Sequence, residues 1–112
     1  MIYSQGDILL ASLVFTNQAG AKRRPVMVVY DSGEDDLLIA PITSRPARTG
    51  YDVALAQWQQ SGLRLPSTAR VDKLATVEKS AILRQLGAVG RADWANSVMA
   101  LRRLFDTIVP AQ

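Results

Sequence analysis

Residues 25–30 read PVMVVY, a short run rich in β-branched side chains that begins with proline. A strand tolerates proline at its first position, so this run predicts a strand that begins at Pro25. Two apolar runs of similar length, ILLASLVF at 8–15 and LLIAPIT at 37–43, flank it across polar, glycine-containing segments. Residues 51–55, 68–74 and 82–89 add three short segments, of which the first two alternate polar and apolar side chains as strands do. We therefore expect strands from about residue 8 to about residue 89.

The C-terminal part of the chain has a different period. Apolar side chains recur at spacings of four and three residues, at Trp94, Val98, Leu101, Phe105 and Ile108. This spacing places them on one face of an amphipathic helix over about residues 92–108, which Pro110 ends. Because there is no repeat and no linker, we expect one mainly β domain over residues 1–112, a small barrel with a C-terminal helix.

The composition excludes several chemistries. The chain has 112 residues, 48% of them hydrophobic, and neither cysteine nor histidine. Disulfides, thiolate zinc sites, iron–sulfur clusters, histidine metal ligands and histidine-assisted nucleophiles are therefore excluded, and we expect no metal and no cofactor. Thirteen Lys and Arg against ten Asp and Glu give a net charge of +3, which favours a polyanionic partner.

Membrane association is not expected from the sequence. No stretch approaches the ~20 apolar residues that span a bilayer. The start of the chain, MIYSQGD, has no positive segment of the kind that opens a signal peptide. We therefore expect a cytoplasmic protein.

Two polar clusters adjoin predicted strands. Lys22-Arg23-Arg24 directly precedes Pro25, and three adjacent cations can bind phosphates, although such a run is also common in solvated loops. Thr43-Ser44-Arg45 ends the third predicted strand, where a hydroxyl can reach a ligand or simply form a turn.

A third cluster is Arg70-x-Asp72, which also includes Lys73. The period of two in a strand would put Arg70 and Asp72 on one sheet face, where the guanidinium would hold the carboxylate ionised. Such a pair can bind phosphate and transfer a proton, or it can be a structural ion pair.

The order and spacing of these motifs resemble the MazF/PemK family of toxins. The similarity extends from about residue 3 to 104. It rests on GDI at 6–8, GAKRRPVMVV at 20–29, APITS at 40–44, SGL at 61–63, PS at 66–67 and ARVDKLATV at 69–77. The resemblance implies an SH3-like barrel with a C-terminal helix, usually a homodimer. It further implies a metal-independent endoribonuclease acting on single-stranded RNA, the toxin half of a type II toxin–antitoxin pair. The antitoxin would be an acidic, partly disordered protein, and DNA would be contacted only through the antitoxin complex.

Residue by residue, the resemblance carries catalytic roles to Arg24, Thr43, Arg70 and Asp72. The expected RNA-binding residues around them are Lys22, Arg23, Ser44, Arg45, Arg48, Lys73 and Gln18. In such an enzyme the 2′-OH attacks the phosphate and leaves a 2′,3′-cyclic phosphate and a 5′-OH. Arg24 suits stabilisation of the phosphorane charge, Thr43 a hydrogen bond to the substrate, and Asp72 proton transfer. The sequence does not decide which group is the general base and which the general acid.

One segment departs from the family pattern. Many members have Gly-x-Glu-Gln after the first strand, whereas residues 16–20 here read TNQAG, without a carboxylate. Gln18 can hydrogen-bond RNA but cannot act as a base. Two alternatives stay open: a non-catalytic toxin that inhibits DNA gyrase, and a nucleic-acid-binding regulatory module. The gyrase alternative is weakened because the chain ends in TIVPAQ, which lacks the Trp-Gly-like signature of gyrase-poisoning relatives.

Overall fold

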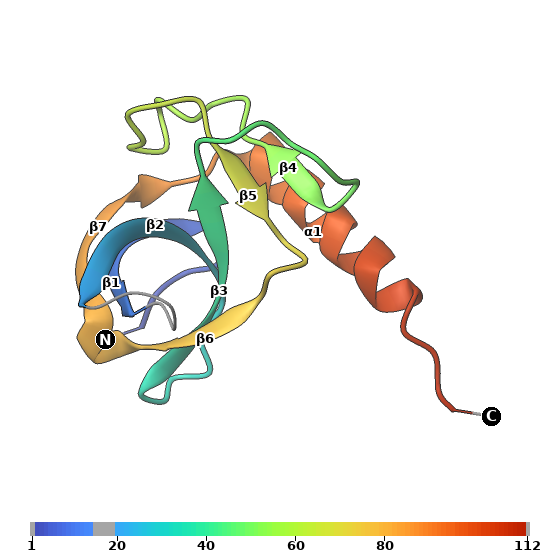
Figure 1. Ribbon diagram of the computed structural model, residues 1–112, viewed down its shortest axis with the longest axis horizontal. Coiled ribbons are helices and arrows are strands. Elements are labelled where there is room, and N and C mark those ends of the chain that lie inside the picture. The colour runs from blue at the N-terminus through green and yellow to red at the C-terminus, as the bar shows by residue number, and fades with distance from the viewer. Residues whose placement is uncertain (1, 15–19, 112) are drawn as a thin grey trace.

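A curled antiparallel sheet flanked by one long helix makes up the computed structural model, which describes residues 2–14 and 20–111 (Figure 1). The strands are β1 Asp7–Val14, β2 Ala21–Tyr30, β3 Asp36–Thr43, β4 Asp52–Ala54, β5 Thr68–Arg70, β6 Ala75–Glu78 and β7 Ile82–Ala88. A 3-10 turn, η1 (Lys79–Ala81), joins β6 to β7, and the helix α1 covers Arg91–Asp106. The expected mainly β fold with a C-terminal helix is confirmed.

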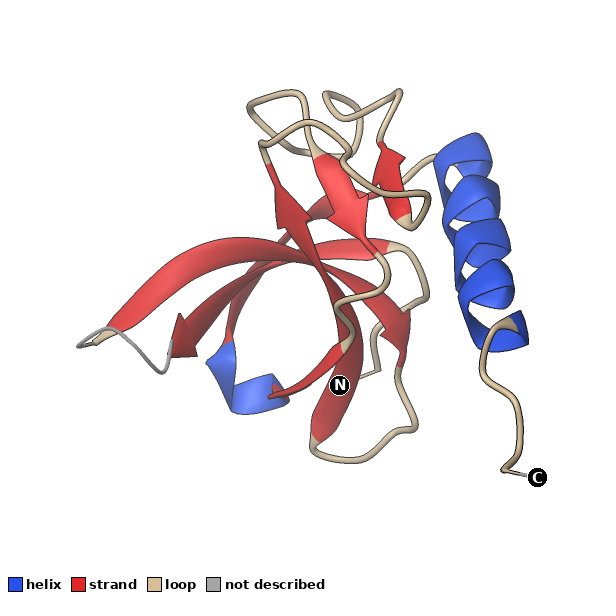
Figure 2. Ribbon diagram, turned by 45° about the vertical axis from the view of Figure 1, so that its right-hand side comes forward, coloured by secondary structure: helices blue, strands red, loops and turns tan. Residues whose placement is uncertain are grey.

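The strand order is β4-β5-β3-β2-β1-β7, and β6 pairs with β3 along the same edge as β5. All pairs are antiparallel. The sheet curls as a barrel does (Figure 2), but among the described residues its end strands β4 and β7 do not pair with each other, so it is not closed.

Both faces of the sheet are packed, and β2 shows why. Its residues alternate, so that Met27 joins one buried cluster while Val26 and Val28 join the other. The first cluster lies under α1 and includes Leu101. The second lies inside the curl of the sheet with Leu9, Leu37 and Ile39. The same alternation continues along β2, so successive side chains outside the two clusters also point to opposite faces of the sheet.

The buried face of α1 differs from the predicted stripe. Asp93, Ser97, Ala100 and Leu101 are buried, whereas Phe105 is 53% exposed and Ile108 lies beyond the helix, 67% exposed. The predicted apolar stripe therefore extends beyond the buried part of α1, because the last turns of the helix run past the strands on which it packs (Figure 1). Instead, the Asp93 carboxylate accepts the N–H groups of the loop after β4, at 2.9 and 3.0 Å.

Two strand boundaries also differ from the expectation. β2 begins at Ala21, four residues before Pro25. β5 ends at Arg70, because the N–H of Lys73 donates to the Arg70 carbonyl (3.1 Å) and closes a turn. The chain then forms β6, which the sequence did not predict.

The buried carboxylate of Asp31 links the N-terminal segment to the turn after β2 and to η1. Asp31 accepts the N–H groups of Tyr3 (2.8 Å) and Gly33 (2.7 Å) and pairs with the Lys79 ammonium at 3.1 Å. The bond from Tyr3, followed by those from Gly33 and Lys79, lowers the pKa of Asp31 to about 2, although burial acts to raise it.

Within residues 2–14 and 20–111, no helix combines the length and apolar character needed to cross a bilayer.

Candidate nucleic-acid interface

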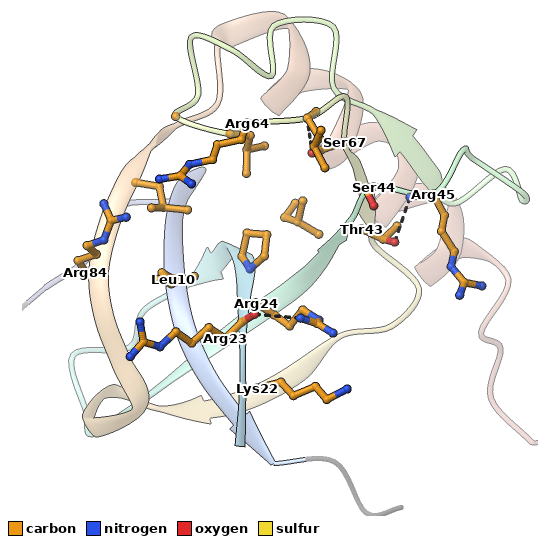
Figure 3. Close-up of a pocket in the computed structure, with 16 residues that line it drawn as sticks. Leu10, Lys22, Arg23, Arg24, Thr43, Ser44, Arg45, Arg64, Ser67 and Arg84 are labelled. Carbon is orange, nitrogen blue, oxygen red and sulfur yellow. Dashed lines mark hydrogen bonds between the residues drawn. The ribbon is translucent and has the colours of Figure 1, made fainter. Parts of the chain in front are cut away.

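Two clefts open where the two packed faces of the sheet end. The larger, which we call the basic cleft, has a volume of about 1000 Å³ and is drawn in Figure 3. The second cleft, of about 630 Å³, includes Arg70, Lys73 and the apolar side chains of Ile39 and Pro41. Arg24 and Thr43 line both clefts, so these two residues mark their boundary.

The basic cleft has an apolar floor and a cationic rim. Leu10, Pro25, Ile42 and Leu86 line it and are buried or half-buried, so they form its floor. Six exposed cations surround the floor: Lys22, Arg23, Arg24, Arg45, Arg64 and Arg84. Of the residues that the structure describes, no Asp or Glu lines this cleft. Between them, the floor and the rim can hold a ligand that combines flat apolar groups with negative charge.

None of these cations is neutralised by the protein as described. In residues 2–14 and 20–111, salt bridges join Arg70 to Asp52 and Lys79 to Asp31, both outside the basic cleft. Crowding like charges without counter-charges is unfavourable in the absence of an anion and raises the positive potential of the cleft.

The cationic run is divided by the alternation of β2. Arg24 pairs with Ala11 of β1, and Arg23 pairs with Ser12, so successive side chains leave the strand in opposite directions. In Figure 3, Arg23 points to the side of the cleft where Arg84 and Arg64 lie, while Arg24 points to the side of Thr43 and Arg45. The Nη1 of Arg24 also donates to the Arg23 carbonyl, at 3.1 Å.

Thr43 stands at the end of β3 and is half-buried. Its Oγ1 accepts the N–H of Arg45 at 3.2 Å, which is the turn-forming contact that a hydroxyl makes at the end of a strand. Because an accepting hydroxyl keeps its own hydrogen, Thr43 can still donate to a ligand in the cleft.

The partner of Arg70 is Asp52, not Asp72. The expectation that Arg70 and Asp72 share a strand face was wrong, because β5 ends at Arg70 and Asp72 lies in the following turn. Asp52 stands directly across from Arg70 in the β4–β5 ladder, with Oδ1 3.7 Å from Nε. Its other oxygen accepts the N–H of Arg48 at 2.9 Å. Asp72 Oδ1 is buried and has no hydrogen-bond partner among the described residues.

The structure brings most of the predicted residues together. Lys22, Arg23, Arg24, Thr43, Ser44 and Arg45 line the basic cleft, and Arg70 and Lys73 line the second cleft with Arg24 and Thr43. Arg48 and Asp72 line neither. Gln18 lies outside the described residues.

Two cations of the rim, Arg64 and Arg84, were missed by the sequence reasoning. Arg64 falls in the segment 57–65, whose pattern is ambiguous apart from a turn that Ser61-Gly62 suggests. Arg84 could have been found, because in β7 it is two residues from Leu86 and so shares its face.

A pair of glycines brings the loop of Arg64 against β7. Gly62 has φ +88°, and a Cβ there would overlap the carbonyl oxygen of Leu86. A Cβ on Gly87 would overlap the carbonyl oxygen of Ser61 in turn. The two backbones therefore touch directly, which only glycine permits, and the loop closes one side of the basic cleft.

The model of the PemK-like, MazF-like toxins of type II toxin–antitoxin systems matches residues 4–105. No curated protein matches the chain in sequence.

Solved structures share the fold. The Mycobacterium tuberculosis toxin MazF-mt6 is 23% identical and matches with a TM-score of 0.74 over 89% of this chain and 96% of its own. A mycobacterial endoribonuclease in complex with its cognate antitoxin is 17% identical, with a TM-score of 0.76 over 97% and 100% of the two chains. A MazE–MazF complex from Deinococcus radiodurans is 21% identical, with a TM-score of 0.75 over 95% and 98%.

Proposed function

The chain belongs to the PemK-like, MazF-like toxins of type II toxin–antitoxin systems, and from this membership we propose that it is a cytoplasmic endoribonuclease toxin. Its substrate in this proposal is single-stranded RNA, including messenger RNA, and its effect is to stop translation and growth. A solved structure of similar fold is described as an endoribonuclease with its antitoxin, which supports the same activity here.

One observation carries the proposal: Arg24 and Thr43 lie at the boundary of two clefts, beside an apolar floor and five further cations that no described carboxylate neutralises. Single-stranded RNA presents unstacked bases and one phosphate per nucleotide, which match such a floor and rim. A duplex hides its bases and would leave the floor uncovered.

The chemistry that these side chains can supply is cleavage by the 2′-OH of the substrate. The 2′ oxygen bonds to phosphorus, the bond to the 5′ oxygen breaks, and a 2′,3′-cyclic phosphate and a 5′-OH result. In the proposal Arg24 stabilises the negative charge of the phosphorane, and Thr43 donates a hydrogen bond to the substrate. Arg70 lines the second cleft, from which it can reach the same phosphate. The family resemblance assigns proton transfer, without a metal, to Asp72, which lies in the turn after β5 and lines neither cleft.

The experiment is cleavage of a mixed-sequence RNA in EDTA, with the ends of the products identified. Arg24→Ala and Thr43→Ala test the proposed site. Arg102→Ala is the matched control, because Arg102 is an exposed arginine of α1 that lines neither cleft. We expect cyclic-phosphate ends with the wild type and the control, and a loss of kcat of about a hundredfold for Arg24→Ala.

Intact RNA with correctly folded wild-type protein would refute the endoribonuclease proposal. A salt-sensitive RNA gel shift without cleavage would instead support a binding module, and inhibition of gyrase would support a non-catalytic toxin. Asp72→Asn belongs in the same series, because unchanged cleavage by this variant would remove Asp72 from the mechanism.

Two protein partners form part of the proposal. The solved complexes of MazF and MazE, which share this fold, support a cognate antitoxin, and the cations of the clefts suit an acidic, partly disordered one.

A homodimer is supported by apolar side chains that α1 and its C-terminal extension expose, namely Met99, Phe105, Ile108 and Val109. Sedimentation at micromolar concentration that shows only a 12.2 kDa species would refute the dimer.

A further inference from the structure

We propose that Arg64 and Arg84 form a second phosphate subsite in the basic cleft, which binds a phosphate of the RNA other than the one cleaved. The inference rests on the proposed RNA substrate and adds to it two residues that neither the motifs nor the family resemblance assigns. In this subsite the two arginines act on binding, and they take no part in the chemical step.

The two side chains come from different elements and meet at one wall. Arg64 belongs to the loop that follows Gly62, and Arg84 belongs to β7. Figure 3 shows both guanidinium groups on the same side of the cleft, while Arg24 reaches toward Thr43 on the other side. The reacting phosphate, placed at Arg24, therefore lies away from this wall.

Both guanidinium groups are free to bind a ligand. Arg64 and Arg84 are exposed, and the side chain of neither has a hydrogen bond or ion pair with any residue in the ranges 2–14 and 20–111. An arginine that stabilises the fold generally has a carboxylate or carbonyl partner, as Arg103 has in the Gly50 carbonyl. Two unpartnered arginines on one wall instead offer forked donors, which match phosphate oxygens.

The wall is held in place by backbone contacts. Arg84 pairs with Leu10 of β1, a residue of the cleft floor. The direct contact of Gly62 with the Leu86 carbonyl brings the loop of Arg64 to the same strand. Subsites built on strands and tight backbone contacts keep their geometry, so little ordering is needed when a phosphate binds.

The covalent geometry of the substrate makes a second phosphate necessary. A single strand that places one phosphate at Arg24 carries further phosphates on both sides of it, joined through the nucleotides whose bases cover the apolar floor. The strand that crosses the floor from Arg24 meets the wall formed by Arg64 and Arg84, with Arg23 pointing to the same side. This arrangement predicts that the subsite contributes affinity through the backbone, independent of base sequence.

Binding is tested with a labelled, mixed-sequence 2′-O-methyl oligonucleotide of about 15 nucleotides, which cannot be cleaved through its 2′ position. The variants are Arg64→Ala, Arg84→Ala and the double variant, with Arg102→Ala as the matched control. We expect each alanine variant to bind about fivefold more weakly at 0.1 M salt, and the slope of log K against log salt to fall by about 0.7 for each arginine. Arg64→Lys and Arg84→Lys should keep most of the slope because they keep the charge.

Cleavage kinetics separate binding from chemistry. The double variant should raise KM by about 25-fold, the product of the two binding losses, with kcat within about twofold of wild type. Urea unfolding and sedimentation of each variant should match the wild type, since neither arginine side chain has a partner in the described part of the chain.

Each outcome bears on one proposal. Salt slopes equal to those of Arg102→Ala, a loss confined to kcat, or an altered oligomeric state would overturn the subsite. A wild type that binds the oligonucleotide but cleaves no RNA would refute the endoribonuclease, whereas the subsite would still be judged by the slopes.

Discussion

Replacement of Asp52 by asparagine tests the finding that this residue is the partner of Arg70. The carboxylate of Asp52 is 2% exposed, and its Oδ1 lies 3.7 Å from Arg70 Nε. Two unit charges at about this distance attract by about 4 kcal/mol at an effective dielectric constant of about 20. The Arg70 side chain is 27% exposed, so solvent screens part of this, and asparagine avoids the cost of burying a charge. We therefore expect Asp52→Asn to lower the free energy of unfolding by about 2 kcal/mol.

A double-mutant cycle measured by urea unfolding isolates this pair. Asp52→Asn keeps an oxygen that can accept the N–H of Arg48, which is bonded at 2.9 Å in the wild type, so that backbone contact is preserved. With Arg70→Gln as the second change, we expect a coupling of about 1–2 kcal/mol between positions 52 and 70. The same cycle between Arg70 and Asp72 is the control, since no salt bridge joins them among the described residues.

The two cycles have opposite expectations, so the result is decisive. A coupling below about 0.5 kcal/mol is expected for positions 70 and 72, as for residues without a direct contact. Additive effects at 52 and 70, together with strong coupling at 70 and 72, would refute the pairing that the structure shows.

Three further changes test the framework of the fold. Gly62→Ala should lower the free energy of unfolding by about 3 kcal/mol, because φ is +88° and a Cβ would overlap the Leu86 carbonyl; Gly50→Ala, with open space around it, should be nearly neutral in the same urea titration. Asp93→Ala should cost about 3 kcal/mol by the same measurement, since two charge-assisted bonds to the loop after β4 are lost, and an effect below about 1 kcal/mol would contradict this. Asp31→Asn should lower the Tm at pH 7. Because the pKa of Asp31 is about 2 in the folded protein against 3.8 for the free side chain, the difference in Tm from wild type should shrink below pH 4 and be lost as the pH falls through 2, and a difference independent of pH would contradict the assignment.

The local part of the fold could be predicted from the sequence. Strands β1, β3 and β7 follow from short apolar runs, and the existence of α1 follows from its spacing of three and four. The orientation of α1 could not be predicted, because its buried face is set by what the sheet presents. Asp93, a charged residue, is buried since it accepts two backbone N–H groups of a loop more than thirty residues away.

The candidate site was predictable where it is local in the chain. Arg24 and Thr43 follow from strand ends and from the family resemblance, and the structure places them together. The partner of Arg70 was not predictable, because a cross-strand pair depends on the register of β4 against β5. Arg64 was missed for a related reason, since its place depends on the contact of Gly62 with a distant strand.

The net charge of +3 gives little indication of how the cations are used. In the described part of the chain, Asp31 and Asp52 neutralise Lys79 and Arg70, while the six cations of the basic cleft have no carboxylate beside them. Carboxylates thus stabilise the framework, and the cleft keeps its charges free for a ligand. Alternation in β2 then separates two adjacent arginines: Arg24 faces the proposed reacting phosphate, and Arg23 faces the wall with Arg64 and Arg84. On a loop, these adjacent basic residues would form a single patch. Because they lie on a strand, their side chains diverge and can contact two positions along one RNA chain.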